Sequence, residues 1–494
     1  MATRQVAGDI DVLRSDPASG GVNRWQWRVD ATVLGAVAVV IRLPALFATR
    51  SLVFDDGVFG VSALAMRRGE LPFRDVFSSQ GPVFLPLVWV ADLLGLRTLD
   101  APRLLSVAAG VLVTIATYSC ARRVTSRGNA LLAAGLVTTS GSVLWVTGPV
   151  NADGPSLALS VLAIALALRT LGRGPRPLDA VWVGLAAGAA ASIKALSVPA
   201  IATAGVVLLL TGSGTIARRV REPALAAAIA VAVYVVCALP WGVGRVWDQS
   251  FSYHNDARRL SSRPGAAGKV VQTLWDRDLL VLVALALAVG MFVVCRFTGS
   301  RVAGAGGRPR VGVVVAVLVG WAVLVFALLV WEPALFRAHV AHLVPPLALL
   351  AALRPPPWPV VAVALVVAAP FWASDNRSIL WPEGYRGAQA ELVHRIRQLP
   401  SGSLVISDDP GYAWRAGHGP PGELADTSFQ RIEAGQITES SLARAAASRA
   451  VCGVVVTSPQ HFGSFRSLGG KLEAEGYTAS SVGSFTLYTR HDCG

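Results

Sequence analysis

Charged residues are scarce in this sequence of 494 residues, where they make up only 15% of the total. Soluble domains contain about a quarter of such residues. Hydrophobic residues account for 53%, and the mean hydropathy is +0.54. This composition excludes an ordinary soluble enzyme. Many apolar runs reach the roughly 20 residues that a helix needs to cross a bilayer, so we expect a polytopic membrane protein.

Lysine is also nearly absent: only three of the 44 basic residues are lysine, and the rest are arginine. The net charge of +14 would suggest a nucleic-acid partner in a soluble protein. No basic stripe with interleaved aromatic residues is present, and we therefore expect no nucleic-acid partner. The arginines instead flank apolar segments, as the positive-inside rule predicts for the cytoplasmic loops of a protein in the lipid bilayer.

Cysteine occurs five times and never with the spacing of a metal-binding pair. Cys120, Cys237 and Cys295 lie in apolar segments, where cysteine usually serves as a small core residue. Cys452 and Cys493 lie in the polar C-terminal region. These two can form a disulfide if that region faces an oxidising compartment.

The apolar runs predict eleven transmembrane helices, and arginine supports this number. With the N-terminus inside, every inner connection between these helices contains arginine. Counting residues 82–96 as another span would place those arginines outside, so we expect 82–96 to be a surface or re-entrant helix at the outer face. The eleven segments are 31–49, 101–121, 129–147, 154–171, 178–193, 195–211, 223–241, 278–296, 311–330, 335–352 and 358–373.

The resulting fold class is an all-α polytopic membrane bundle with a small C-terminal α/β domain outside the membrane. Residues 1–30 form a cytoplasmic tail, 31–373 the transmembrane domain and 374–494 the extracytoplasmic domain. The first outer loop adds juxtamembrane helices, one of which, GVFGVSALAMRRGE, is expected along the surface. In the C-terminal domain, alternating patterns predict strands at SLVIS, CGVVVTS and SVGSFTLYTR with helices between them.

Three groups of polar residues meet at the outer face in this topology. Ionisable residues at the edge of apolar segments are costly and suggest a functional site. Each residue alone also fits an interface side chain or a helix cap. The first group contains Asp55, Asp56, Asp75 and Gln80, the second Asn151 and Asp153, and the third Lys194, Glu332, Arg337, His339 and His342.

The first outer loop, DDGVFGVSALAMRRGELPFRDVFSSQGP, resembles that of the GT-C superfamily of membrane glycosyltransferases. It is most similar to the branch of protein O-mannosyltransferases and aminoarabinose transferases. Both have an acidic pair, an alanine-containing helix, Gly, Pro, an aromatic residue, Asp and a polar-Pro element. The segments APRLLSVAAGVLVTIATYSCARRV, SIKALSVP and FRAHVAHLVPPLALL resemble later stretches of the branch more loosely.

The resemblance implies an enzyme whose donor is a sugar on a polyprenyl phosphate. Asp55 matches the catalytic acidic residue of the family, and Asp56 its acidic neighbour. The sequence departs from the pattern at Gln80-Gly81-Pro82, where several members have His or Lys before Pro. We therefore expect the donor phosphate to be bound elsewhere, with Lys194, Arg337, Arg74 and Arg103 as candidates.

The chemistry of such a transfer agrees with the residue types present. A carboxylate such as Asp55 is suited to take the proton of an acceptor hydroxyl, and a single base without a second nucleophile inverts the anomeric configuration. The leaving phosphate needs cations or amide donors. A divalent cation held by Asp56 and Asp153 is a further option, since oxygen ligands suit a hard ion. The predicted substrate-binding residues are Asp75, Gln80, Asn151, Asp153, His339 and His342.

Two other classes of function remain open at this point. A secondary transporter or lipid flippase would fit a polytopic protein, but transporters place polar groups near the bilayer midplane, whereas here they gather at one face. An assembly protein whose outer domain binds a partner is the third. The favoured expectation is a glycosyltransferase of the bacterial plasma membrane, with its N-terminus in the cytoplasm and a glycan, lipid or protein as acceptor.

Overall fold

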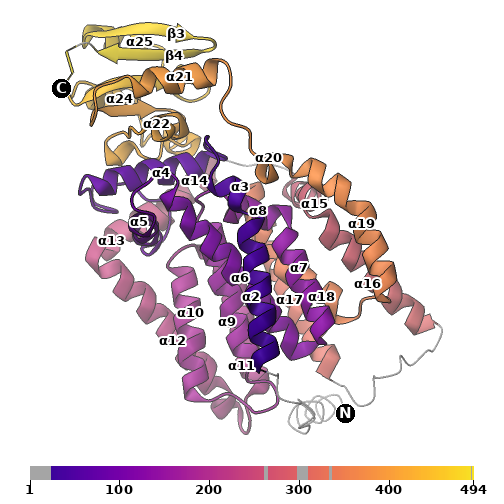
Figure 1. Ribbon diagram of the computed structural model, residues 1–494. Helices are drawn as coiled ribbons and strands as arrows, with labels where there is room; N and C mark the ends of the chain where they lie inside the picture. The colour runs from indigo at the N-terminus through magenta and orange to yellow at the C-terminus, as the bar shows by residue number, and fades with distance from the viewer. Residues whose placement is uncertain (1–23, 261–264, 298–309, 333–335, 491, 494) are drawn as a thin grey trace.

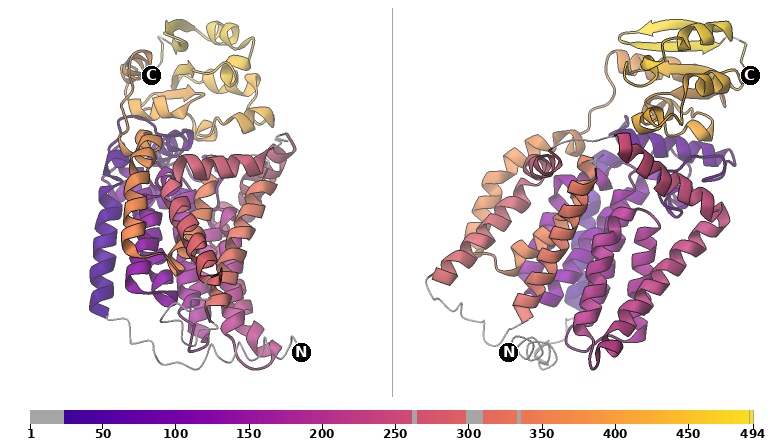
Figure 2. Two further views of the ribbon diagram at one scale, coloured as in Figure 1. Left: turned by 90° about the vertical axis from the view of Figure 1, so that its right-hand side faces the viewer. Right: turned by 180° about the vertical axis from the view of Figure 1, so that it is seen from behind.

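The computed structural model describes residues 24–260, 265–297, 310–332, 336–490 and 492–493. A bundle of long helices carries a small sheet domain at one end (Figure 1). The side and rear views show the same two parts, with the sheet domain always at the end where α4 lies (Figure 2). Most of the predicted cytoplasmic tail, 1–30, lies outside the described residues. The first described helix, α2, begins at Arg24.

Each of the eleven predicted segments is helical. Four stretches are long and apolar enough to cross a membrane within the described residues, or up to six if each of two bent helix pairs is one span. Several spanning helices are thus confirmed, whereas the number eleven stays a prediction. The bundle consists of α2 (Arg24–Val40), α3 (Leu43–Leu46), α6 (Leu104–Val124), α7 (Arg127–Thr139), α8 (Gly141–Thr147), α9 (Asp153–Leu168), α10 (Pro177–Ala191), α11 (Val198–Thr211), α12 (Ile216–Ala238), α16 (Leu279–Phe297), α17 (Arg310–Trp331), α18 (Val344–Leu353) and α19 (Trp358–Asp375).

Shorter helices gather at the end of the bundle that faces the sheet domain (Figure 1). They connect the long helices and position the polar loops between them. They are α4 (Phe54–Arg67), α5 (Phe84–Leu94), η1 (Ala101–Arg103), η2 (Ala195–Ser197), η3 (Leu239–Trp241), α13 (Val243–Trp247), the π-helical η4 (Asp248–Ser252), α14 (Tyr253–Leu260), α15 (Ala266–Arg277), η5 (Arg337–Leu343) and α20 (Arg377–Leu380).

The two bent pairs meet at their breaks. Helices α7 and α8 bend by 60° around Ser140, and α15 and α16 bend by 100° around Asp278. The Ser140 hydroxyl donates to Asp278 Oδ1 at 2.5 Å, and the backbone N–H of Ser142 donates to the same oxygen at 3.1 Å. Gly141 leaves no room for a side chain, because an added Cβ would lie 2.0 Å from Asn376 Oδ1. The Asp278 carboxylate therefore satisfies a backbone N–H at the start of α8, where the helix has no partner of its own for that group.

The segment 82–96 contains only the eleven-residue helix α5. Such a helix is about 16 Å long, too short to cross a hydrocarbon core of about 30 Å, which agrees with the prediction for this segment. Helix α4 differs from the prediction of a surface helix. Its residues from Asp56 to Met66 are all buried. The sheet domain packs against α4 through α22, and this tertiary contact was not visible in the sequence.

The C-terminal domain has a four-stranded mixed sheet of order β1-β2-β4-β3. Strands β1 and β2 are parallel and the other neighbours are antiparallel. The sequence predicted three of the four strands; β3 was missed, since its mostly exposed side chains are small and polar. The elements are α21 (Ala388–Arg397), β1 (Leu404–Ser407), α22 (Pro410–Ala416), η6 (Gly422–Leu424), α23 (Phe429–Glu433), α24 (Glu439–Ala446), β2 (Val451–Val456), η7 (Phe462–Ser464), α25 (Leu468–Ala474), β3 (Tyr477–Val482) and β4 (Phe485–Arg490).

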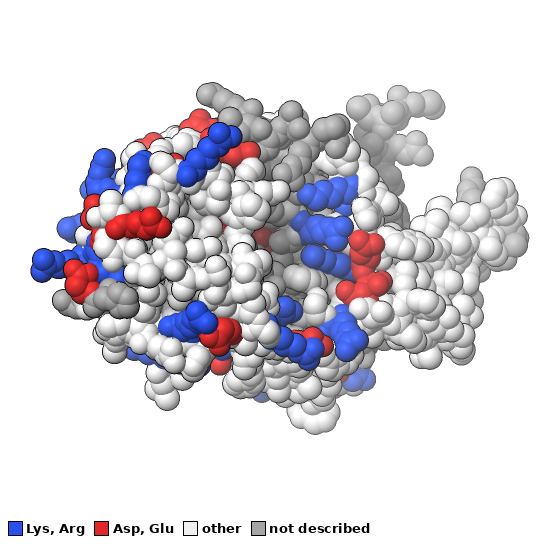
Figure 3. Space-filling view, turned by 90° about the horizontal axis from the view of Figure 1, so that it is seen from above, with Lys and Arg blue, Asp and Glu red and all other residues white. Residues whose placement is uncertain are grey.

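The surface of this end of the molecule is polar only in part. Seen from above, acidic and basic side chains are scattered over the left and the middle of the view, whereas the projecting part on the right is almost free of charge (Figure 3). Cys452 and Cys493 form a disulfide in the C-terminal domain, with their Cα atoms 5.5 Å apart. Their pairing, which the sequence left open, is thereby confirmed.

Candidate active site

Asp55 lies in the first turn of α4, where the helix dipole favours a carboxylate. Its Oδ2 accepts a hydrogen bond from the Asn151 side-chain amide at 3.0 Å. The residue is partly exposed, and no cation of the described chain forms an ion pair with it. Asp55 therefore has a carboxylate that is held by one neutral donor and remains open to a ligand.

Burial raises the pKa of Asp55 to about 6, and the nearby Lys194 partly opposes this effect. The negative charges of Asp153 and Asp426 raise the pKa further. Asp426 belongs to the C-terminal domain, which therefore contributes charge to the site. A carboxylate with a pKa of about 6 is largely ionised at neutral pH and is still basic enough to accept a proton.

Asn151 is oriented by the turn that contains it. Its side-chain carbonyl accepts from the backbone N–H of Asp153 at 2.7 Å. Because this bond occupies the oxygen, the amide NH₂ group is left to face Asp55. The turn ends where α9 begins at the buried Asp153. Asn151 thus links the first outer loop to the second group of polar residues.

Lys194 connects the second group to the third. Its ammonium donates to Asp153 Oδ2 at 2.8 Å and lies 3.1 Å from His339 Nε2. Since an ammonium can only donate, Nε2 of His339 must accept, and the proton of this ring is on Nδ1. His339 Nδ1 lies 3.2 Å from Glu332 Oε2, which is placed to accept that proton in a hydrogen bond.

His342 lies on the other side of Asp153. Its Nε2 is 3.5 Å from Asp153 Oδ1. Within the described residues, neither of these two buried atoms has a hydrogen-bond partner. A buried polar atom without a partner costs about 1–3 kcal/mol, so both atoms favour a ligand that brings hydroxyl groups.

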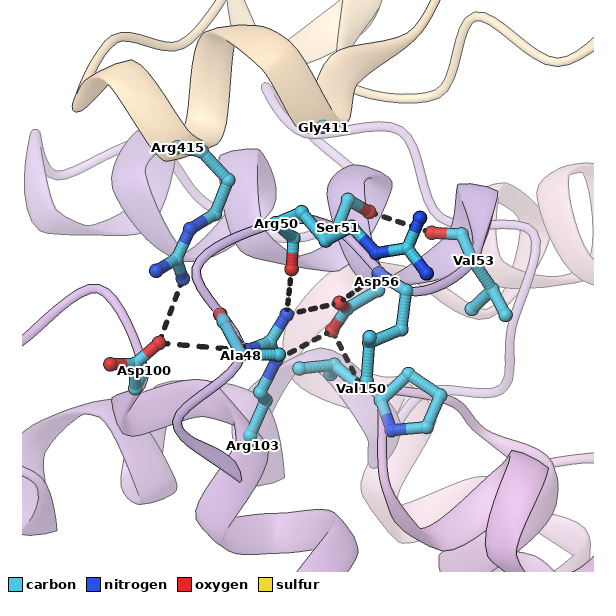
Figure 4. Close-up of polar contacts among 12 residues, drawn as sticks. Ala48, Arg50, Ser51, Val53, Asp56, Asp100, Arg103, Val150, Gly411 and Arg415 are labelled. Carbon is cyan, nitrogen blue, oxygen red and sulfur yellow. Dashed lines mark hydrogen bonds and ion pairs between the residues drawn. The ribbon is translucent and has the colours of Figure 1, made fainter. Parts of the chain in front are cut away.

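Asp56 and Arg103 form a separate, fully buried ion pair (Figure 4). Arg103 Nη2 lies 2.6 Å from Asp56 Oδ2, and the backbone N–H groups of Leu52 and Val150 also donate to this carboxylate, at 3.0 and 2.8 Å. The remaining guanidinium hydrogens of Arg103 are directed to the carbonyls of Leu46, Ala48 and Arg50.

This geometry argues against two of the predicted roles. Neither the Asp56 carboxylate nor the Arg103 guanidinium is exposed, so neither can meet a substrate. Asp56 was expected to act with Asp55, and Arg103 to bind the donor phosphate. The two carboxylates diverge because successive residues of a helix are turned by about 100° from each other. Asp56 and Arg103 instead fix the loop that precedes Asp55.

The C-terminal domain is hydrogen-bonded to the loop that precedes Asp55. Arg415 of α22 donates to Asp100 Oδ1 at 2.7 Å (Figure 4). It also donates to the carbonyl of Thr49 at 3.2 Å. Helices α4 and α22 come so close that a Cβ added to Gly57 would lie 2.4 Å from the backbone nitrogen of Gly411. No motif distinguished these contacts in the sequence, because they depend on how two domains pack.

Residues 79–241 match the family model described as dolichyl-phosphate-mannose-protein mannosyltransferase. This match covers 163 of the 494 residues, about a third of the chain, and makes that part similar to these membrane glycosyltransferases. The expectation of a transferase from the first outer loop is thereby confirmed. No curated protein has a significant match to the sequence.

Solved structures support the fold of this glycosyltransferase. ArnT from Cupriavidus metallidurans bound to undecaprenyl phosphate matches with a TM-score of 0.67 and 15% identity over 96% of this chain and 100% of ArnT. The apo state of the same protein gives a TM-score of 0.65 at 15% identity over 94% and 98%. An oligosaccharyltransferase from Archaeoglobus fulgidus matches with a TM-score of 0.51 and 13% identity over 88% and 69%. At these identities the likeness concerns the fold.

The other predicted site residues of the glycosyltransferase lie outside this cluster. Arg74 pairs with Asp75 at 3.6 Å, and the Asp75 carboxylate closes its own turn by accepting from the Leu71 N–H. The Gln80 amide donates to Ser79. Arg337 is half-exposed and pairs with Asp276 at 3.6 Å. The structure therefore brings together Asp55, Asn151, Asp153, Lys194, His339 and His342, with Glu332 at the edge.

A metal site was among the possibilities raised by the sequence. Among residues 24–493, as far as they are described, no group of three or more His, Cys, Asp or Glu side chains is arranged to hold an ion. Asp56, the ligand expected to act with Asp153, is occupied by Arg103. The positive charge beside Asp153 is supplied by Lys194.

Proposed function

We propose that this glycosyltransferase moves a sugar from a polyprenyl phosphate to an acceptor hydroxyl at the outer face of the bacterial plasma membrane. The observation that carries the proposal is the environment of Asp55. This partly exposed carboxylate has a pKa raised to about 6 and lies next to a cluster that contains one cation and two histidines. The cluster combines a base with groups that can meet a phosphate and a sugar.

Asp55 is the general base of the proposed reaction. It takes the proton of the acceptor hydroxyl while the acceptor oxygen bonds to the anomeric carbon. The bond from that carbon to the phosphate oxygen breaks, its electron pair stays with the oxygen, and polyprenyl phosphate leaves. Asp153 is paired with Lys194 at 2.8 Å and is not free to act as a nucleophile. A single displacement therefore inverts the configuration at the anomeric carbon.

Lys194 is the cation proposed to stabilise the leaving phosphate. Its ammonium is largely buried, where a positive charge acts more strongly on an anion than it does in water. Asp153 Oδ1 and His342 Nε2 are the atoms proposed to receive hydroxyl groups of the sugar. Arg337 and Arg74 lie at exposed positions and stay candidates for the entry of the lipid phosphate.

Two observations support an extracytoplasmic site. The domain that packs over α4 contains the disulfide Cys452–Cys493, which is stable in an oxidising compartment. The opposite end of the bundle carries arginines at Arg123, Arg169 and Arg173, as the positive-inside rule predicts for the cytoplasmic face. The lipid donor is proposed by analogy with ArnT, whose structure holds undecaprenyl phosphate.

The decisive experiment measures release of polyprenyl phosphate when purified protein meets a panel of polyprenyl-phosphate sugars and acceptors. The parent protein should release it with one donor of the panel, and Asp55→Asn should not. Asp75→Asn is the matched control, because Asp75 lies in the same loop but outside the cluster. Equal release by the parent and Asp55→Asn would refute the role of Asp55. Retention of the anomeric configuration in the product would refute the single displacement.

A further inference from the structure

A hollow lined by four arginines lies at the end of the bundle away from the C-terminal domain. Its volume is about 380 Å³. Arg123 comes from the last turn of α6, and Arg169, Arg173 and Arg176 come from the connection between α9 and α10. We call it the arginine hollow. Helix α9 separates it from Asp153 by 16 residues, or about 24 Å, so it is distinct from the transfer site.

The charges of the arginine hollow are not balanced. Its only acidic lining residue is Asp179, whose two oxygens accept from the Arg173 side chain at 2.7 Å and from the Arg176 backbone N–H at 3.0 Å. In the part of the chain that the structure describes, no acceptor engages the side chains of Arg123 or Arg169. Guanidinium groups that converge without a counter-charge produce a positive potential that attracts an anion.

The positive-inside rule accounts for arginines in a cytoplasmic loop but not for their convergence on a hollow. The rim contains two large apolar side chains, Leu178 and Trp182, of which 64% and 52% are exposed. Tryptophan is typical of the membrane–water boundary. The hollow therefore lies where a lipid headgroup would meet the protein.

A narrow apolar groove begins beside the arginine hollow. Val124 and Leu168 line the groove, and their sequence neighbours Arg123 and Arg169 line the hollow. The groove has about 30 Å³ of open space, is lined by residues of α6, α9, α11, α17 and α18, and exposes only apolar atoms. Arginines beside an apolar surface can bind a molecule that has an anionic headgroup and a hydrocarbon chain.

We infer that the arginine hollow binds the phosphate headgroup of an anionic membrane lipid, whose acyl chains lie against the apolar rim at Leu178 and Trp182. Guanidinium groups bind phosphate oxygens in pairs of parallel hydrogen bonds, and basic pockets between transmembrane helices suit anionic headgroups. The site differs from the proposed donor site in position and in ligand. The inference does not depend on the proposed sugar transfer.

Binding is tested with purified protein titrated with phosphatidylglycerol, while native mass spectrometry counts bound lipid and thermal unfolding reports its effect. The test variant is Arg123→Gln/Arg169→Gln, since both residues are exposed and their side chains form no hydrogen bond or ion pair within the described residues. The control is Arg218→Gln/Arg221→Gln, which removes the same charge from exposed positions in the first turns of α12. Phosphatidylcholine with the same chains and free glycerol phosphate complete the set.

We expect phosphatidylglycerol to bind the parent and the control variant equally well, within about twofold, and the test variant about thirtyfold more weakly. Phosphatidylcholine should bind all three weakly. Equal binding by the parent and the test variant would overturn the inference. If the control variant loses as much affinity for phosphatidylglycerol as the test variant, the loss reflects net charge alone, and the inference is overturned as well. If glycerol phosphate binds the parent as tightly as the lipid does, the occupant is a free phosphate and the lipid assignment is wrong.

Discussion

Arg415 of the C-terminal domain and Asp100 of the bundle form an ion pair of 2.7 Å beside the buried pair of Asp56 and Arg103. Asp100 also lies 3.5 Å from Arg103, so one carboxylate contacts a cation from each domain. Through this carboxylate, α22 of the C-terminal domain is connected to the loop that leads to Asp55. The domain therefore has a part in positioning the base.

Replacing Arg415 tests this connection. Arg415→Gln removes hydrogen bonds of a charged, nearly buried group, so we expect a loss of about 1.5–3 kcal/mol of stability. Turnover should fall as the loop before Asp55 loosens. Thermal unfolding and release of polyprenyl phosphate measure the two effects. Arg395→Gln is the control, because its pair with Glu391 is exposed and should contribute little to stability. Unchanged turnover in Arg415→Gln would show that the C-terminal domain does not position the base.

The close approach of α4 and α22 gives a second prediction. In Gly57→Ala the new methyl group would lie 2.4 Å from the Gly411 nitrogen, so the two helices must separate. We expect both a lower unfolding temperature and lower turnover. Gly470→Ala in α25 has open space around its Cβ and should be neutral or stabilising. Wild-type behaviour of Gly57→Ala would mean that the contact between the domains is not tight in solution.

The sequence predicted much of the membrane domain because apolar runs depend on local composition. It also placed Asp55, Asn151, Asp153, Lys194, His339 and His342 at one face, since alternating connections of a helical bundle reach the same end. The structure adds that five of these residues are linked by hydrogen bonds, from Asp55 through Asn151 to Asp153 and from Asp153 through Lys194 to His339, whereas His342 lies beside Asp153 without one.

The roles of Asp56 and Arg103 could not be predicted in the same way. Nothing in the sequence distinguishes the two adjacent aspartates. In the structure, the turn of α4 directs the Asp55 side chain to the cluster and the Asp56 side chain to Arg103. The burial of α4 and the contribution of Asp426 depend on how the C-terminal domain packs. Such long-range contacts leave no periodic signal in a single sequence.

The raised pKa of Asp55 predicts an acidic limb in the pH dependence of the reaction. Because the base must be ionised, kcat/KM should rise as the pH increases through about 6 and then become constant. An ordinary aspartate would give a limb near pH 4. The profile is measured with saturating acceptor and limiting donor. A rate that stays flat between about pH 5 and 7 would contradict the proposed base.

Burial raises the pKa of Asp55, and Lys194 lowers it. Removing the Lys194 side chain should therefore move the acidic limb of the pH profile. In Lys194→Met the limb should shift to higher pH, and turnover should fall by about tenfold or more because the leaving phosphate loses its cation. Lys194→Arg should restore the position of the limb better than it restores turnover, since the guanidinium is larger. Loss of turnover without a shift of the limb would mean that Lys194 does not act on Asp55. Lys471→Met, at an exposed pair with Glu439, is the control.

Asp55 and Asp56 should have opposite effects on stability, although they are neighbours. The folded pKa of Asp55, about 6, lies above its unfolded value of about 4, so the folded state binds more protons between these values and loses stability as the pH rises through them. Asp55→Asn removes this loss and should unfold at a higher temperature than the parent at about pH 8, with a smaller difference at about pH 4. Asp56→Asn leaves the buried Arg103 without its counter-charge and should cost about 3–5 kcal/mol. Thermal unfolding of both variants at the two pH values measures the contrast. If Asp55→Asn is less stable than the parent at the higher pH, the Asp55 carboxylate stabilises the fold, as that of Asp56 does. That result would contradict the proposed role of Asp55 as the general base.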